Sequence, residues 1–227
     1  MAMKQRIPVL VAALCVSGLL IIPVWPRFIG GAIVAPYEDT LRDIARGKKL
    51  PSTLLAETDT ALRVAGRWSD RGENHTRLGS LRLVAARNAI LAADQRAALD
   101  RAVSELSDGV ARKPAQPYAW LQLAQAVRAR RGTIPVIEKY LGLSTRLARW
   151  EHRLVMPRLE IALGVWPALG SSYRATLPPQ LERAVDTAPV ALARSVRRNF
   201  ALRQARQMLS ASPLHLDRFT LVYLSLD

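Results

Sequence analysis

The side chains that could take part in acid–base or metal chemistry are few and lie far apart in this chain. The three histidines are His75, His152 and His215, and the single cysteine is Cys15. No two of these residues stand at the short spacing with which metal ligands follow one another along a helix or loop. We expect His75 to lie in a polar loop with a solvated side chain, and we expect no metal site.

Acidic residues occur in three close pairs, at Glu57 and Asp59, Asp94 and Asp100, and Glu105 and Asp108. A glycosidase needs two carboxylates that face each other across a cleft of about 5–10 Å. Each pair here lies along a single predicted helix, where helix caps and solvated faces explain it better. The sequence also lacks a nucleophile elbow, a phosphate-binding loop and a dinucleotide fingerprint. We therefore predict no catalytic residues, no cofactor and a protein that is not an enzyme.

Two basic regions are stronger candidates for binding. A predicted helix after Pro189 carries five arginines beside apolar residues: Arg194, Arg197, Arg198, Arg203 and Arg206. In the second region, Tyr118 lies near Arg128 and Arg131 in sequence. Each region is either a solvated face whose arginine stems cover apolar surface or a docking surface for an anionic partner.

The overall charge favours an acidic partner. The chain has 33 basic and 18 acidic residues, a net charge of +15. Anionic lipid headgroups, an acidic polymer and an acidic protein all fit this charge. A GC-rich genome is the alternative explanation for the many arginines. The arginines are scattered over many helices without an aromatic-interleaved stripe, so we do not expect nucleic acid to bind.

The longest apolar stretch predicts a membrane anchor. Residues 7–25 carry no charge, and Lys4 and Arg6 precede them. As a helix this stretch would be about 28 Å long, close to the roughly 30 Å of a bilayer's hydrocarbon core. We predict a transmembrane helix over 7–25. A cleaved signal peptide, a lipid-modified Cys15 and a buried helix of a soluble protein remain the alternatives.

The charges beside this stretch predict its orientation. The leading residues 1–6 carry Lys4 and Arg6 without an acid, whereas Arg27 and Arg42 follow the stretch together with the acids Glu38, Asp39 and Asp43. The positive-inside rule assigns 1–6 to the cytoplasm. In a bacterium, the rest of this single-pass inner-membrane protein would then face the periplasm.

Beyond the span the composition predicts an all-α protein. Ala and Leu dominate, and runs of strand-forming residues are nearly absent. We expect a connector over 26–51 with a short helix at about 36–46, followed by a helical domain over 52–227. Proline and glycine breaks delimit its expected helices, at about 52–69, 76–92, 95–112, 133–149, 150–166, 177–186, 190–210 and 213–224.

One part of this domain resembles the tetratricopeptide repeat, a pair of antiparallel helices of 34 residues. Ala102, Leu106, Gly109 and Pro114 match the small, large, small and proline positions of a second helix and its end. The first helix of the next repeat is matched by Trp120, Leu123, Ala124 and Val127. The resemblance covers about 95–131 and implies stacked helical hairpins that bind other proteins. A generic helical bundle is the alternative.

Together these features predict a non-catalytic, membrane-anchored scaffold or recruitment protein of a bacterial cell-envelope assembly. The resemblance implies other envelope proteins as partners, and it extends to the assemblies that make or export surface polysaccharide. Two alternatives stay open. One is a basic protein that binds a membrane surface or a polyanion, and the other is an envelope enzyme with an unrecognised site.

Overall fold

The computed structural model describes residues 24–45, 48 and 50–226, and within them every regular element is a helix. A helix over 24–34 leads into η1 (Ala35–Tyr37). The helices that follow are α2 (Glu38–Ala45), α3 (Ser52–Trp68), α4 (Gly72–Asn88), α5 (Ala92–Arg112), α6 (Pro117–Ala129), α7 (Ile134–Leu147), α8 (His152–Gly164), α9 (Ser171–Arg174), α10 (Pro178–Thr187), α11 (Pro189–Arg198), α12 (Leu202–Leu209) and α13 (Pro213–Leu224), with η2 (Trp166–Ala168) after α8. The predicted all-α class is confirmed.

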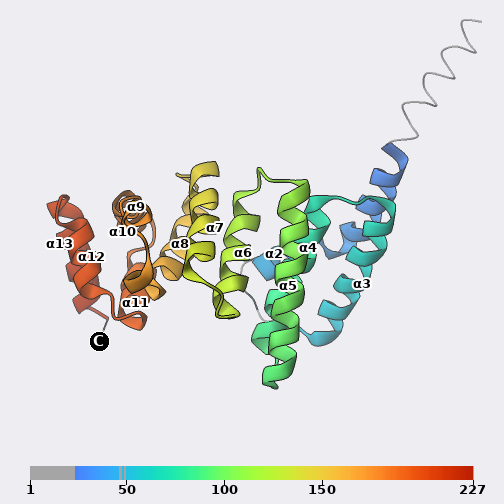
Figure 1. Ribbon diagram of the computed structural model, residues 1–227, viewed down its shortest axis with the longest axis horizontal. Helices are drawn as coiled ribbons and strands as arrows, with labels where there is room; N and C mark the ends of the chain where they lie inside the picture. Colours follow the sequence, from blue (N-terminus) through green and yellow to red (C-terminus); the bar gives the residue numbers. More distant parts are fainter. Residues whose placement is uncertain (1–23, 46–47, 49, 227) are drawn as a thin grey trace, which may run out of the picture.

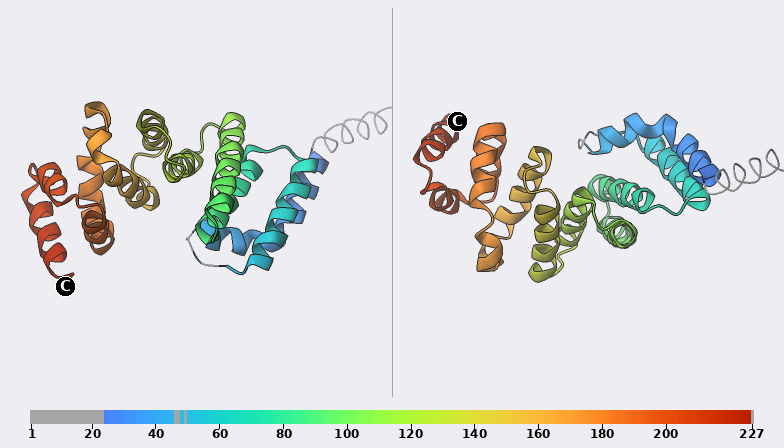
Figure 2. Two further views of the ribbon diagram at one scale, coloured as in Figure 1. Left: turned by 60° about the horizontal axis from the view of Figure 1, so that its bottom comes forward. Right: turned by 90° about the horizontal axis from the view of Figure 1, so that it is seen from above.

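The helices form an elongated array. They follow one another along the long axis of the molecule, from α3 at one end to α12 and α13 at the other (Figure 1). The pairs α4–α5 and α6–α7 are antiparallel hairpins that pack against each other, and the view from above shows the later helices continuing the stack (Figure 2). One large apolar core runs from α4 to α13, and two smaller clusters lie beneath α2 and α3.

The predicted membrane span cannot be compared with this array. Apart from its last two residues, the stretch 7–25 lies outside the described residues. Among the helices that the structure describes, none joins the length and the apolar composition that crossing a membrane requires. The anchor therefore stays a prediction from the sequence.

Close contact between α4 and α5 depends on two glycines. A Cβ atom at Gly79 would lie 2.5 Å from Cγ of Leu106, and one at Gly109 would lie 2.6 Å from Oγ1 of Thr76. Such distances are too short for real contacts, so larger residues would push the two helices apart. Gly109 is one of the small positions on which the tetratricopeptide resemblance depends, and the packing gives it a physical reason.

A buried arginine joins three helices in the middle of the array. Arg158 on α8 has no solvent exposure, and its guanidinium donates hydrogen bonds to the last turn of α7. Nε bonds to Oγ of Ser144 at 3.0 Å, Nη2 to the Ser144 carbonyl at 2.7 Å and Nη1 to the Ala148 carbonyl at 2.9 Å. Ser144 in turn donates to the carbonyl of Pro117, the first residue of α6, at 2.8 Å. The side chain thus caps the carbonyl end of α7 and ties α8 to α6 and α7.

Several predicted helix limits were wrong. The helix predicted over 76–92 ends at Asn88, and the next helix begins at Ala92 rather than 95. Helix α4 begins at Gly72 rather than 76 because the expected loop residues join it, and the Asn74 side chain bonds back to the Ser69 carbonyl at 3.2 Å. The single helix predicted over 190–210 is two helices, α11 and α12, which meet at Asn199–Phe200–Ala201.

The turn between α11 and α12 holds an unfavourable residue. Phe200 has a φ of 53° and is 93% exposed. Its N–H bonds to the Arg197 carbonyl, and the N–H of Ala201 bonds to the Val196 carbonyl. This is the pattern of a helix end that normally places glycine in the left-handed position, and a side chain there strains the backbone.

We predict that Phe200→Gly raises the free energy of unfolding by about 0.5–1 kcal/mol, because it relieves this strain without removing a buried contact. Chemical denaturation would measure the change. Ala201→Gly is the matched control, since Ala201 is buried with a φ of −102° and has no such strain to relieve. This variant should lower the free energy of unfolding by about 0.5–1 kcal/mol. Destabilisation by Phe200→Gly would contradict the analysis.

Candidate functional site

One concave feature of the array is a groove along α4, α6 and α8. It consists of two adjoining pockets of about 490 Å³ and about 450 Å³ that share Ile44, Ser80 and Tyr118. Helix α2 contributes Ile44, and the turn of α5 nearest α4 contributes Gln95 and Leu99. These two pockets are called the groove below.

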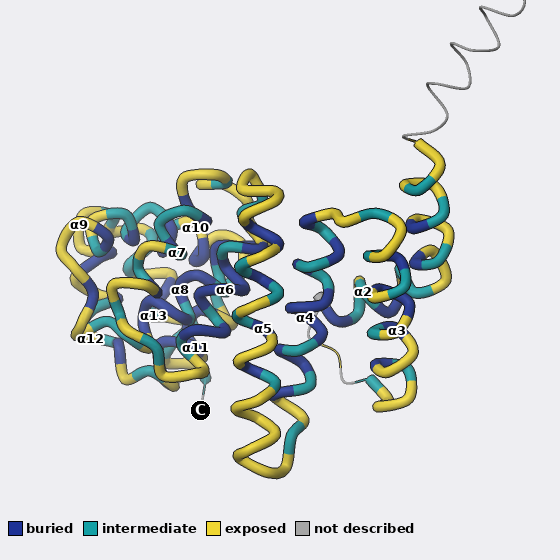
Figure 3. The backbone as a smooth tube through the Cα atoms, turned by 45° about the vertical axis from the view of Figure 1, so that its right-hand side comes forward, coloured by how far each residue is buried: buried dark blue, intermediate teal, exposed yellow. Residues whose placement is uncertain are grey.

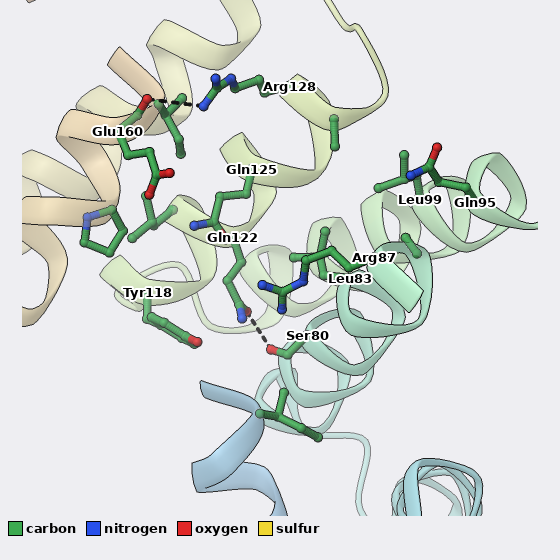
Figure 4. A pocket seen from close by; sticks show the side chains of 16 residues that line it. Ser80, Leu83, Arg87, Gln95, Leu99, Tyr118, Gln122, Gln125, Arg128 and Glu160 are labelled. Carbon is green, nitrogen blue, oxygen red and sulfur yellow. Dashed lines mark hydrogen bonds between the residues drawn. The ribbon is translucent and has the colours of Figure 1, made fainter. Parts of the chain in front are cut away.

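The middle of the groove is polar. Ser80 on α4 donates a hydrogen bond of 2.7 Å to Oε1 of Gln122 on α6, and Gln125 lies one helical turn further along α6 (Figure 4). The Ser80 hydroxyl oxygen also lies 2.8 Å from the Thr76 carbonyl oxygen, within α4. Burial raises the pKa of the Tyr118 phenol above its ordinary value, and its hydroxyl can donate a hydrogen bond at neutral pH. The arrangement suits hydrogen bonds to a peptide backbone.

The acidic side chains that line the groove already form ion pairs. Glu38 and Glu73 pair with Arg77 at 3.0 and 3.1 Å, and Glu160 pairs with Arg198 at 2.9 Å.

Arg87 and Arg128 differ from these paired groups. Arg87 on α4 is exposed, and Arg128 on α6 donates to the backbone carbonyl of Glu160 at 3.2 Å. Neither guanidinium has a carboxylate within salt-bridge distance in the described part of the chain. The groove therefore offers two cations to an anionic ligand, and both are labelled in Figure 4.

The structure brings together some of the residues singled out from the sequence and separates others. Tyr118 and Arg128 both line the groove, whereas Arg131 is exposed at the α6–α7 turn with a φ of 60°. Sequence analysis missed Arg87, Gln122 and Gln125. Their one signal is that Gln122, Gln125 and Arg128 recur at helical spacing near Tyr118, and nothing in the sequence indicates that Arg87 faces them from another helix.

The arginines of the predicted basic helix do not form one surface. Arg197 donates to the carbonyls of Tyr223 and Leu226 and stacks on the Tyr223 ring, so it caps the end of α13. Arg198 is held by Glu160. The remaining three, Arg194, Arg203 and Arg206, are exposed and divided between α11 and α12. The break at Phe200 is the physical reason for the division.

His75 was expected in a solvated loop, and that prediction was wrong. It lies on α4, with Nδ1 2.8 Å from Glu105 on α5 and Nε2 2.9 Å from Asp70. Arg112 completes the cluster with a hydrogen bond of 3.0 Å from Nε to Asp70. Burial alone lowers the pKa of His75, but the hydrogen bonds with Glu105 and Asp70 outweigh it, so the pKa is raised. The cluster fastens the start of α4 to α5, away from the groove.

Comparison of the chain with protein-family models, with curated proteins and with solved structures finds no match. Among the described residues, no group of three or more histidine, cysteine, aspartate or glutamate side chains is arranged to hold a metal ion.

The raised pKa of His75 predicts a pH-dependent stability. Protonated His75 is favoured in the folded state, so its contribution is complete below the unfolded pKa of 6.5 and is lost as the pH rises through the higher folded pKa. We expect the free energy of unfolding to fall between pH 6 and pH 8. His75→Gln should remove the part of this decrease that the deprotonation of His75 causes. Urea denaturation at each pH measures it.

The control variant for this experiment is His152→Gln, because the His152 side chain is 59% exposed beside Glu151. It should keep the wild-type dependence on pH. If His75→Gln also keeps that dependence, the bonds to Glu105 and Asp70 do not stabilise the fold.

Proposed function

We propose that this protein is a non-catalytic scaffold that holds an extended, acidic segment of a partner protein in the groove. The observation that carries the proposal is the pair Arg87 and Arg128, whose guanidiniums face a groove whose carboxylates are already paired. Charged groups of one sign along a concave surface attract a ligand of the other sign and fix its register. Carboxylate side chains of the partner would complete both ion pairs.

The rest of the lining supports a peptide rather than a small metabolite. Gln122, Gln125 and Tyr118 provide amide and hydroxyl groups at the spacing of one helix face, and Leu83, Leu99 and Ile161 provide apolar surface in the same lining. A segment in extended conformation presents backbone donors and acceptors along its whole length. Its apolar side chains would alternate with the acidic ones.

The composition of the groove favours binding over catalysis. The described histidines lie outside it, and the Ser80 hydroxyl bonds to an amide rather than to a base. Glu160 is the one carboxylate in the larger pocket and is paired with Arg198. An enzyme would need a nucleophile with a neighbouring base, or two carboxylates facing a shared space.

The apolar stretch 7–25 supports extending this proposal to a membrane tether. With the basic residues before it in the cytoplasm, the array would act in the periplasm of a bacterium as a recruiting subunit of a cell-envelope assembly. The resemblance to tetratricopeptide repeats supports protein partners for that role, including those of surface-polysaccharide machinery.

A photocrosslinking experiment tests the groove directly. A benzoylphenylalanine at position 125, in the middle of the groove, is compared with one at exposed Ser172 on α9, both in the full chain within the native membrane. We expect position 125 to capture a partner segment that mass spectrometry maps as acidic, and position 172 not to capture it.

The charge-neutral variant Arg87→Gln with Arg128→Gln should reduce this capture at least about tenfold, because two charge-assisted hydrogen bonds are lost. Arg194→Gln with Arg203→Gln removes the same charge from exposed positions on α11 and α12 and should leave capture unchanged. A basic or neutral captured segment, or equal capture by both variants, would refute the proposal.

A further inference from the structure

The turn between α4 and α5 is an apolar projection of the array. It comprises residues 89–91, and its tip extends beyond the neighbouring helix ends (Figure 1); most of the tip is coloured as exposed in Figure 3. Ile90 is 98% exposed and Leu91 is 63% exposed. These side chains contribute almost nothing to the core of the array.

Other residue types at this turn would make the fold more stable. Leu91 is the N-cap of α5, and no side chain there satisfies the free N–H groups of the helix. Serine, aspartate or asparagine at an N-cap typically stabilises a helix by about 1 kcal/mol relative to an apolar residue. The sequence therefore places two large apolar side chains in water, one of them at a position where a polar residue would stabilise the fold.

The turn is also flanked by cations. Arg87 near the end of α4 and Arg96 in the second turn of α5 are both exposed, and neither forms a salt bridge with an acid of the described chain. Asp94 is the acid in the first turn of α5. The projection thus carries an excess of positive charge around an apolar tip.

We propose that the α4–α5 turn docks the array on an anionic lipid bilayer, with Ile90 and Leu91 inserted at the headgroup boundary. Large apolar side chains surrounded by basic ones bind such an interface through buried apolar area and attraction to anionic lipid. A bilayer accepts a projecting tip without a preformed pocket, whereas a protein partner would need a matching cavity. Ile90 and Leu91 lie outside the groove, whereas Arg87 borders both the groove and the turn.

The test uses a reporter on the tip itself, because residues 7–25 can hold the full chain in lipid by a different route. Figure 1 shows the α4–α5 turn and the start of the helix over 24–34 at opposite edges of the array. The full chain, with Cys15→Ala and Ala89→Cys labelled with nitrobenzoxadiazole, is held in neutral-lipid nanodiscs. Separate vesicles with brominated acyl chains are then added, with and without phosphatidylglycerol.

We expect vesicles with phosphatidylglycerol to quench the label and shift its emission to the blue, and added salt to reverse both effects. Neutral vesicles should quench at least about tenfold less at the same lipid concentration. Ile90→Ser with Leu91→Ser should also weaken quenching by about tenfold or more, because two apolar side chains no longer enter the lipid. The serine at the N-cap stabilises α5, so loss of folding cannot produce this result.

Leu221→Ser with Leu224→Ser is the matched control, since both leucines are exposed on α13 at the far end of the array. It should keep wild-type quenching. Equal quenching by neutral and anionic vesicles, or unchanged quenching with Ile90→Ser and Leu91→Ser, would overturn the proposal. So would vesicle binding that leaves the label in water, because another surface would then be responsible.

Discussion

The fork of hydrogen bonds from Arg158 is the interaction on which the middle of this array depends. A guanidinium removed from water is costly, and burial lowers the pKa of Arg158. Its compensation is a set of backbone and hydroxyl acceptors rather than an ion pair, and these acceptors are the carbonyl end of α7. Through Ser144 the same fork reaches the first residue of α6. It fixes α8 against the α6–α7 hairpin.

The position of α8 determines the shape of the groove. Glu160, Ile161 and Pro157 come from α8, and they face Arg128 and Gln125 on α6. At the other end, close packing at Gly79 and Gly109 sets α4 against α5 and so positions Ser80 and Arg87. Arg87 and Arg128 thus stand on helices that different contacts hold in place. The two glycines position α4, and the hydrogen bonds of Arg158 and Ser144 position α6. A ligand that binds both arginines would connect the two halves of the array.

Two exposed residues at the ends of helices destabilise the fold. Phe200 occupies a left-handed position that glycine would suit, and Leu91 occupies an N-cap that serine would suit. Neither side chain is buried in return. Strain or exposure of this kind, seen in the structure, is a reason to look for function, and the apolar tip with its flanking arginines gives Leu91 a physical role.

The helices were largely predictable because proline, glycine and apolar periodicity act locally. Helices α6, α7 and α13 each have a proline at one of their first two positions, and the limits of α7 and α13 agree closely with the predicted helices. The break at Phe200 was not predictable, since the turn contains neither glycine nor proline. Arg158 gave no signal either, because an arginine in a helix is usually solvated and only tertiary packing shows that it is buried.

The candidate site was predictable only in part, for the same reason. Tyr118 and Arg128 stood out as an aromatic and a cation on one helix, but Arg87 joins them through the stacking of α4 on α6, which sequence spacing does not contain. The arginines of the predicted basic helix are divided between α11 and α12, and two of them have partners within the chain: Arg198 pairs with Glu160, and Arg197 bonds to the end of α13.

Hydrogen–deuterium exchange of the Arg158→Lys variant tests the central claim most directly. Lysine keeps the charge but cannot donate to three acceptors from a planar fork. We predict faster exchange in 144–164 and at the start of α6, with unchanged protection in α5, where Gly109 and Leu106 hold the helix to α4. Exchange that is unchanged in 144–164, or that increases equally in every helix, would contradict the role assigned to Arg158.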